Sequence, residues 1–273
     1  MVVQKTPQEI ELMARAGEIL AAVHEALREA VQPGMTTADL DAVAVEEIAA
    51  RGGAPGFLGT YGYPAATCIS INDEIVHGVP SGKRRIRAGD VVSVDCGVLW
   101  EGYHSDAACT WVAGGREQAD ERTLELIDGS YEALWRGIGA LRPGCRLGDV
   151  SHAIGTVAER HGLGVVAEHD GHYVGGHGIG RDLHEDPMVL GTGRPGRGMR
   201  LRPGLVFAIE PMFVLGSPAW RLQADGWTLS SLDGSLAAHW EHTVAVTAEG
   251  PRVLTARPGE AALPATPQLA AEA

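Results

Sequence analysis

Long apolar runs, excess positive charge and clustered cysteines are all absent from this chain of 273 residues. No stretch approaches the ~18 apolar residues that a membrane-spanning helix needs, so we expect no membrane span. The chain has 22 lysines and arginines against 35 aspartates and glutamates, a net charge of −13. That balance argues against nucleic-acid binding through a basic surface. The one basic cluster, at 83–87, is expected to be a solvated loop.

The four cysteines, Cys68, Cys96, Cys109 and Cys145, indicate a reducing compartment. They have neither the spacing of a zinc site nor the density of a disulfide-stapled domain. Residues 1–7 also lack the apolar centre of a signal peptide. We therefore expect a cytoplasmic protein.

The spacing of apolar residues predicts pairs of helices that alternate with groups of strands. Thr6 can cap a first helix with Glu9 completing a capping box, and Pro33-Gly34 stops that helix. Three further helices are expected over 37–48, 124–141 and about 148–161. Strand patterns cover 64–76, 90–99, 104–112, 164–175, 205–215, 219–231 and 239–248. The composition of 257–273, rich in Ala, Pro and Glu, predicts a disordered tail.

The order of motifs repeats along the chain. The run 88–95, which ends in Asp95, is echoed by 203–210, which ends in Glu210. Three more echoes follow the same order: a Pro-Gly between two helices, a His-Gly pair, and an acid that begins a run ending in glycine. Four echoes in one order are poorly explained by chance. We therefore predict two helix–helix–strand halves, about 5–118 and 119–255, related by a pseudo-twofold axis.

Such a duplication would bring four acids and one histidine to one central site. The candidate metal ligands are Asp95, Asp106, His177, Glu210 and Glu241. A carboxylate within an apolar strand is costly unless it is paired or bound to a metal. Each residue alone could be a strand-end charge, a surface acid or a loop histidine, but together they occupy corresponding places in the two halves.

The donor set is dominated by oxygen, which suits a pair of divalent first-row metals: Mn, Fe(II), Co or Zn. Between two such ions, ~3.5–4 Å apart, a water loses a proton near neutral pH and becomes a nucleophile. Hydrolysis also needs an oxyanion donor and a group that handles protons, for which His77 and His184 are candidates. His169, His172, His239 and His242 flank the ligand motifs, so they are candidates for outer hydrogen-bond partners of the ligands. His24, His152 and His161 lie in helical patterns and are expected to be structural.

Over about residues 5–255 the sequence resembles the type I methionine aminopeptidases. The resemblance is carried by GYP (62–64), CISIN (68–72), VHGVP (76–80), GDVVSVD (89–95), GYHSD (102–106), GHGIG (176–180), HEDP (184–187), IEP (209–211) and WEHT (240–243). It implies an α/β (α+β) pita-bread fold around a central antiparallel sheet, with one catalytic domain over 1–256.

The same resemblance implies a role for each site residue. Asp95 would chelate one metal, Asp106 and Glu241 would bridge both, and His177 would hold the second with Glu210. Glu210 would also accept the proton of the bridging water. His77 would contact the substrate near the scissile amide, and His184 would stabilise the tetrahedral intermediate. The implied reaction removes the initiator methionine from nascent chains whose second residue is small.

The resemblance also implies a methionine pocket, formed by Tyr63, Cys68, His77 and Trp227. Thr60 stands where the family often has an aromatic residue, and Leu183 where phenylalanine is frequent. These departures leave fine selectivity open. The substrates would be N-termini of nascent polypeptides. We expect no zinc-finger or proline-rich extension, so any ribosome contact would be transient or made by the catalytic domain itself. We also expect a monomer.

Two other functions fit parts of the pattern. Xaa-Pro aminopeptidases and dipeptidases of the same fold share the five ligands, but usually carry a further N-terminal domain for which we expect no room here. A non-catalytic binding protein on this fold would typically have lost metal ligands, and all five are present. A series of Met-Xaa and Xaa-Pro peptides would separate the three.

Overall fold

The computed structural model describes residues 2–260. Its four long helices form two consecutive pairs: α1 (Pro7–Ala30) with α2 (Thr37–Ala50), and α3 (Glu121–Ala140) with α4 (Leu147–His161). The predicted capping box of α1 is present, because Thr6 accepts a hydrogen bond from the Glu9 backbone while the Glu9 side chain accepts one from Thr6. Among these residues no helix has the length and apolar content to cross a membrane.

The first half of the chain builds its sheet around one long hairpin. Strands β4 (Val91–Trp100) and β5 (Tyr103–Val112) pair over ten residues each without a break. Strand β4 also pairs with β1 (Ala54–Pro55) and β2 (Thr67–Ile71), while β3 (Glu74–Val76) belongs to another sheet. Two short 3-10 helices, η1 (Thr60–Gly62) and η2 (Arg116–Gln118), occupy loops. Alternating apolar residues of these strands face α1 and α2 and make one buried cluster.

The second half uses shorter strands. Its main sheet has the order β10–β9–β11–β16–β17, all antiparallel. The bounds are β9 (Gly176–Gly178), β10 (Glu185–Val189), β11 (Val206–Ile209), β16 (His242–Thr247) and β17 (Gly250–Val253). Smaller sheets contain β6 (Gly164–Val165), β7 (Glu168–His169), β8 (His172–Tyr173), β12 (Met212–Val214), β13 (Trp220–Leu222), β14 (Leu229–Ser231) and β15 (Ala237–His239).

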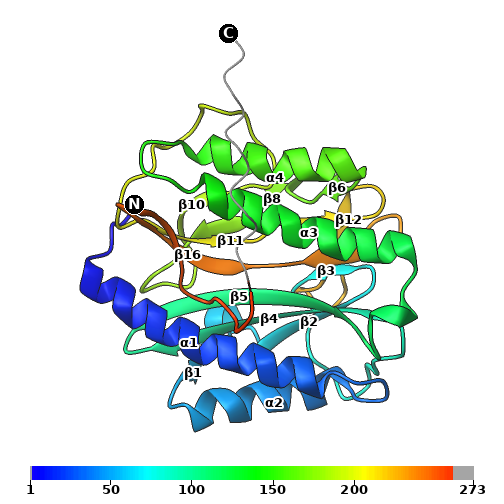
Figure 1. Ribbon diagram of the computed structural model, residues 1–273. Helices are drawn as coiled ribbons and strands as arrows, with labels where there is room; N and C mark the ends of the chain where they lie inside the picture. Colours follow the sequence, from blue (N-terminus) through cyan, green and yellow to red (C-terminus); the bar gives the residue numbers. More distant parts are fainter. Residues whose placement is uncertain (1, 261–273) are drawn as a thin grey trace.

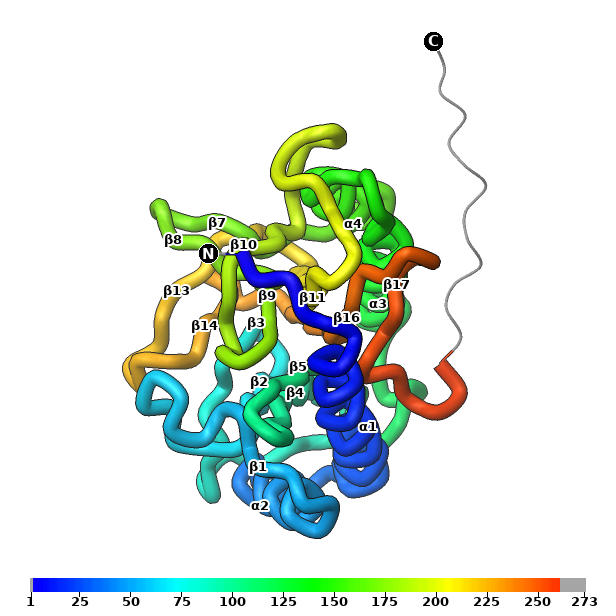
Figure 2. The backbone as a smooth tube through the Cα atoms, turned by 90° about the vertical axis from the view of Figure 1, so that its left-hand side faces the viewer, coloured from blue at the N-terminus to red at the C-terminus, as the bar shows by residue number. Residues whose placement is uncertain are grey.

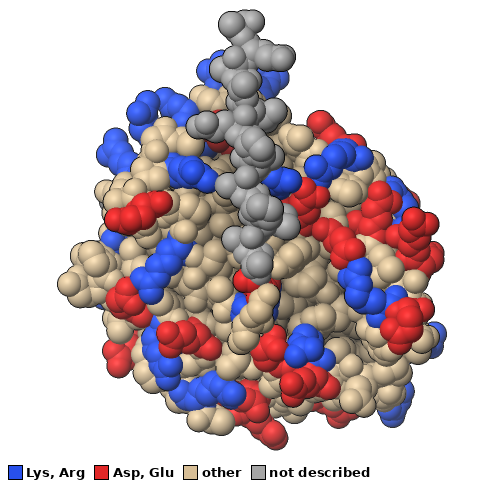
Figure 3. Space-filling view, in the orientation of Figure 1, with Lys and Arg blue, Asp and Glu red and all other residues tan. Residues whose placement is uncertain are grey.

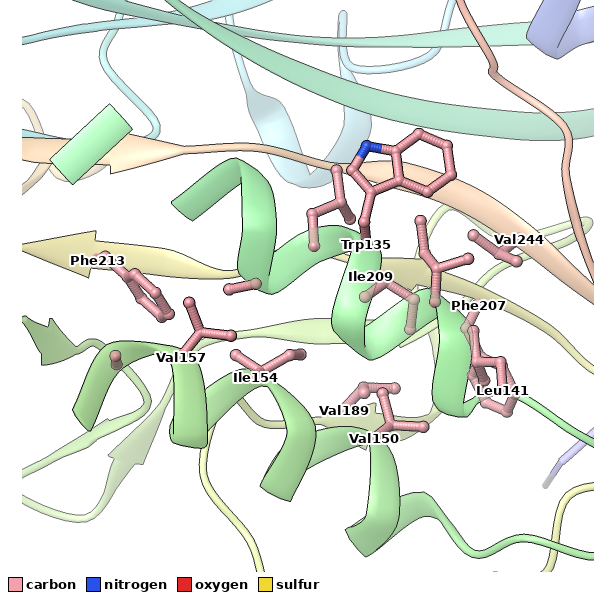
Figure 4. Packing of buried hydrophobic residues seen from close by; sticks show 14 of the residues in the cluster. Trp135, Leu141, Val150, Ile154, Val157, Val189, Phe207, Ile209, Phe213 and Val244 are labelled. Atoms are coloured by element: carbon pink, nitrogen blue, oxygen red, sulfur yellow. The ribbon is translucent and has the colours of Figure 1, made fainter. Parts of the chain in front are cut away.

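The helix pairs cover opposite sides of the sheets (Figure 1). In that view α3 and α4 lie above β11 and β16, and α1 and α2 lie below β4 and β5. The halves meet where Ala108 of β5 and Glu241 exchange two backbone hydrogen bonds, of 3.1 and 3.4 Å. Figure 4 shows the packing on the α3–α4 side, where Trp135 and Ile154 of the helices lie near Ile209 of β11. This α/β fold confirms the predicted class. The contact between β5 and Glu241 lies where the sheets of the two halves meet, between the two helix pairs.

Several predicted strands are broken. The segment 205–215 divides into β11 and β12 at Glu210-Pro211, because proline has no N–H to continue the ladder. The segment 219–231 is a hairpin of β13 and β14 rather than one strand. The segment 164–175 contains only the two-residue strands β6, β7 and β8.

The folded part of the chain extends past the predicted start of the tail. Arg257 is buried and forms an ion pair of 2.5 Å with Glu260, which in turn lies 3.3 Å from His242. Residues 257–260 therefore pack against the second half, and 261–273 lie outside the described residues.

Basic and acidic side chains are interspersed on the face that Figure 3 shows. Among the residues that the structure describes, several opposite charges form surface pairs, for example Arg116 with Asp128 at 2.7 Å.

Candidate metal centre

The register of the first hairpin puts two acids on one face of the sheet. Asp95 of β4 lies opposite Ala108, and Asp106 of β5 lies opposite Gly97. Side chains two residues apart along a strand share a face, and directly opposite residues do as well. Both carboxylates therefore point the same way, and both are buried. Cys68 of β2 pairs with Asp95 in register, which places the thiol beside them.

The second half provides its candidate ligands beside strand ends. His177 lies on β9 opposite Ala208 of β11, and Glu210 comes two residues further along that chain. Glu241 occupies the break between β15 and β16, held by its backbone bonds to Ala108. All five predicted ligands line one cavity of about 420 Å³.

Ligand atoms approach one another closely in two overlapping groups. Atoms of Asp106, His177 and Glu241 all lie within 4.8 Å of one another, as do atoms of Glu210, His239 and Glu241. Between the two groups, His177 Nε2 is 3.6 Å from Glu210 Oε1; within the second group, His239 Nε2 is 3.5 Å from Glu210 Oε2. The structure thus brings the five predicted residues together and adds His239 at ligand distance.

His239 was expected only as an outer partner. It stands two residues before Glu241, so a continuous strand would turn both side chains to one face. That spacing was the available signal. The sequence alone does not show which face of that strand points toward the other acids.

Burial and mutual repulsion disfavour the charged forms of three of the acids. Burial raises the pKa of Asp95 to about 7, with the charge of Glu210 adding to the effect. Burial and the charge of Asp95 raise the pKa of Asp106 well above its usual range. Burial and the charge of Asp106 do the same for Glu241. Burial also opposes ionisation of Glu210, but the neighbouring His239 and His177 outweigh it and lower its pKa.

These residues fit divalent metal ions. Asp95 Oδ1, Asp106 Oδ1 and Glu241 Oε1 are buried and have no hydrogen-bond partner among residues 2–260. Such groups are costly unless something compensates them, and crowded carboxylate oxygens with an imidazole are a donor set for divalent cations. One or more cations would satisfy these oxygens and neutralise the repulsion.

Next to the acids the cavity is lined by aromatic and aliphatic side chains. Trp227 packs edge-to-face on Tyr63, with ring centroids 5.0 Å apart. The Tyr63 hydroxyl donates toward the backbone oxygens of Thr67 and Gly78, at 3.0 and 3.2 Å, which fixes the ring. The predicted pocket residues Tyr63, Cys68, His77 and Trp227 all line the cavity, and so do Thr60 and Leu183.

Phe57 also lines the cavity and was not anticipated from the sequence. A Cβ placed on Gly97 would lie 2.7 Å from its ring, so only glycine at 97 lets the ring lie against β4. The ring also packs edge-to-face on Tyr63 at 6.5 Å.

Two further histidines border the acids. The His184 ring lies 4.3 Å from that of His177, between centroids, and both His184 and His77 line the cavity. Burial lowers the pKa of His77, and burial together with His177 lowers the pKa of His184 to about 4. Both imidazoles are therefore neutral near pH 7 and can each donate one N–H. The other predicted outer partners differ: His242 is buried and bonds Thr255 at 2.9 Å, while His169 and His172 lie against Trp220 away from the cavity lining.

Comparison with known proteins agrees with this arrangement. Residues 11–248 match the profile of metallopeptidase family M24. Methionine aminopeptidase 1 of Mycobacterium tuberculosis is 47% identical over 93% of this chain and 95% of its own. The crystal structure of a methionine aminopeptidase from Thermotoga maritima superposes with a TM-score of 0.89 and 41% identity, over 93% of this chain and 99% of that one. A prolidase from Pyrococcus furiosus matches less closely, with a TM-score of 0.72 and 25% identity, over 93% of this chain and 65% of its own. The chain belongs to metallopeptidase family M24, among its methionine aminopeptidases.

Proposed function

We propose that the protein is a divalent-metal-dependent aminopeptidase that removes the N-terminal methionine of nascent proteins whose second residue is small. The observation that carries this function is one cavity in which a buried cluster of acids and histidines adjoins an apolar slot. The relatives of similar length support the choice of methionine. Nascent chains are the substrates, so the cytoplasm is the proposed site of action.

Two metal ions per chain are proposed, drawn from Mn, Fe(II), Co and Zn. Their ligands would be Asp95, Asp106, His177, Glu210 and Glu241. When bound, such ions lower the pKa of a water molecule and polarise a carbonyl. Glu241 belongs to both groups of ligand atoms and Asp106 to the first, next to Glu241. This supports the proposal that Glu241 would bridge the two ions, with Asp106 beside it as the second bridging acid.

The chain's own side chains divide the remaining work. Glu210 has a lowered pKa and so is ionised, which suits a proton acceptor for the attacking water. His184 is neutral and borders His177, from where its N–H can stabilise the oxygen of the tetrahedral intermediate. His77, which lines the same cavity, would donate to the substrate near the scissile amide.

The apolar slot suits an unbranched thioether. Sulfur makes favourable contacts with aromatic rings, and Phe57, Tyr63 and Trp227 offer three of them. Burial raises the pKa of the Cys68 thiol well above its usual range, so this wall of the slot carries no charge. With its hydroxyl bonded to backbone oxygens, Tyr63 presents no free donor to the ligand.

A peptide series with defined metals tests the function. Chelator-treated protein should be inactive, and added Mn²⁺, Co²⁺, Zn²⁺ or Fe²⁺ should restore hydrolysis of Met-Ala and Met-Gly peptides. Peptides with a bulky second residue, such as Met-Leu, should react poorly. Efficient cleavage of Xaa-Pro peptides without action on Met-Ala would assign the chain to the prolidase activity instead. Inactivity with every metal on every peptide would favour a binding protein.

A further inference from the structure

Large apolar side chains are exposed around the mouth of the cavity. Tyr61, Tyr173 and Met188 are 72%, 57% and 45% exposed, and all three line it. They come from separate segments: Tyr61 from η1, Tyr173 from β8 and Met188 from β10. Exposed apolar groups that gather at one place mark a contact surface.

Tyr61 lies at this mouth in a backbone conformation that is unfavourable for a large side chain. Its φ of +52° lies in the left-handed region, which is unfavourable for a bulky residue. Hydrogen bonds close the turn around it: Gly59 N–H to the Tyr63 oxygen at 2.9 Å and Gly62 N–H to the Gly59 oxygen at 3.1 Å. The ring stacks on His184, with centroids 5.7 Å apart and an interplanar angle of 24°.

Met188 reaches the same place by strand register. It lies directly opposite His177 in the pairing of β10 with β9, so the two side chains share one face of the sheet. Met188 and Tyr61 therefore flank the His177–His184 pair from two directions. The His184 ring centroid lies 4.3 Å from that of His177 and 5.7 Å from that of Tyr61, so the Tyr61 ring lies within ~10 Å of the His177 ring.

We propose that Tyr61, Tyr173 and Met188 form a docking rim for an apolar side chain at the third residue of the peptide substrate. This inference rests on the proposed function. With the methionine in the slot and its peptide bond at the metal centre, the rest of the chain must leave through the mouth. The third Cα then lies about 6 Å beyond the scissile bond in an extended peptide.

Strand alternation selects the third residue rather than the second. Successive side chains of an extended peptide point to opposite sides, so residues one and three share a side. The first enters the slot, and the third then faces the slot's rim. The second points away, toward the side where only a small group is proposed to fit. An apolar third residue would remove itself and the exposed rim side chains from water.

The test is a set of peptides Met-Gly-Xaa with a common C-terminal tail, in which Xaa is Phe, Leu, Gly or Asp. For the unmodified protein we expect kcat/KM for Phe to exceed that for Gly roughly fivefold, as partial burial of one large side chain would give. The difference should lie mainly in KM, because the rim contacts the substrate equally before and during reaction. The doubly substituted Tyr173→Ser, Met188→Ser protein should bring the Phe/Gly ratio close to one.

The matched control is Leu232→Ser, an equally exposed leucine (52%) outside the cavity lining, which should keep the Phe/Gly ratio. Tyr61 is left unchanged because its ring also contacts His184. If the double variant folds poorly, the single variants Tyr173→Ser and Met188→Ser provide a second measurement, and each should lower the Phe/Gly ratio. Cleavage of all four peptides at equal kcat/KM would overturn the rim and leave the proposed function intact. Failure to cleave any methionyl peptide would overturn both.

Discussion

The two halves hold their candidate ligands in different ways. The first half presents Asp95 and Asp106 from within a hairpin whose ladder runs unbroken over ten residues a side. The second half presents Glu210 and Glu241 where its strands are interrupted, after β11 and before β16. A residue inside a ladder is fixed by its neighbours, whereas one at a break can direct its side chain independently. The hairpin thus fixes the positions of its two acids, while the proposed proton acceptor Glu210 and the neighbouring His184 come from the second half; His77 is the first half's contribution beside them.

The largest effect should come from substitutions at the corresponding acids, which test that division. Glu210→Gln should lower kcat by roughly 10²–10⁴-fold even with excess metal, because it changes a residue proposed as both metal ligand and proton acceptor. Asp95→Asn should mainly weaken metal binding, by at least ~10–100-fold, and excess metal should restore much of its kcat. Metal titration followed by activity and metal content measures both.

The surface acid Glu29 on α1 gives a control, because Glu29→Gln should change neither quantity. Equal kcat for the Asp95 and Glu210 variants at saturating metal would remove the distinction between the halves.

Much of this arrangement was predictable from the sequence because the signals are local. The helix caps, such as Thr6 with Glu9, and the apolar periodicity depend on residues a few positions apart. The echo of Asp95 by Glu210 predicted a shared centre for these two acids, and both line one cavity. The caps and the periodicity are each contained in a short stretch of chain, and the echo compares two such stretches.

Features that depend on contacts across the molecule were not predictable. Phe57 reaches the cavity only because Gly97, forty residues away, lacks a Cβ. The packing of Arg257 and Glu260 depends on the buried His242 at the start of β16, a contact that composition cannot reveal, so composition alone suggested disorder there. The division of 205–215 follows from Pro211, whose position was visible, but the direction that Glu210 takes there was not.

The segment 255–260 anchors the interrupted half, and Glu260→Gln tests that anchor. Burial alone would raise the pKa of Glu260, but His242 and Arg257 lower it to about 2. A carboxyl whose folded pKa lies below its unfolded value of ~4.3 stabilises the fold above that value and loses the contribution as pH falls toward the folded pKa. We expect Glu260→Gln to lower the free energy of unfolding at pH 7 by on the order of 3 kcal/mol.

The measurement is urea unfolding between pH 7 and about 3.5, where the gap between the two proteins should narrow below about pH 5. Glu11→Gln is the matched control, since Glu11 forms an exposed ion pair with Arg252 and its loss should cost less than about 1 kcal/mol. A gap that stays constant with pH would show that Glu260 stabilises by packing alone.

The smallest effect concerns a contact that runs from the N-terminal segment to the loop of the other half that carries His184. In Figure 2 this segment passes beside β9 and β10 before α1 begins. The Lys5 backbone N–H bonds the Gly204 oxygen at 2.7 Å, and Lys5 Nζ pairs with Glu185 Oε2 at 2.5 Å. These two side chains are only 4% and 10% exposed, and Glu185 directly follows His184.

Lys5→Met should therefore lower kcat about tenfold, as an outer partner of a catalytic group does, with metal content retained. The cause would be a buried, unpaired Glu185 that lets the His184 loop shift. Adding Glu185→Gln to Lys5→Met should recover part of kcat, since no buried charge then remains alone. Steady-state kinetics of both single variants and the double variant form the cycle, with Lys83→Met as an exposed control. If kcat of the double variant fell by the product of the two single-variant losses, Lys5 and Glu185 would not act as a pair. The position of His184 would then not depend on the contact with Lys5.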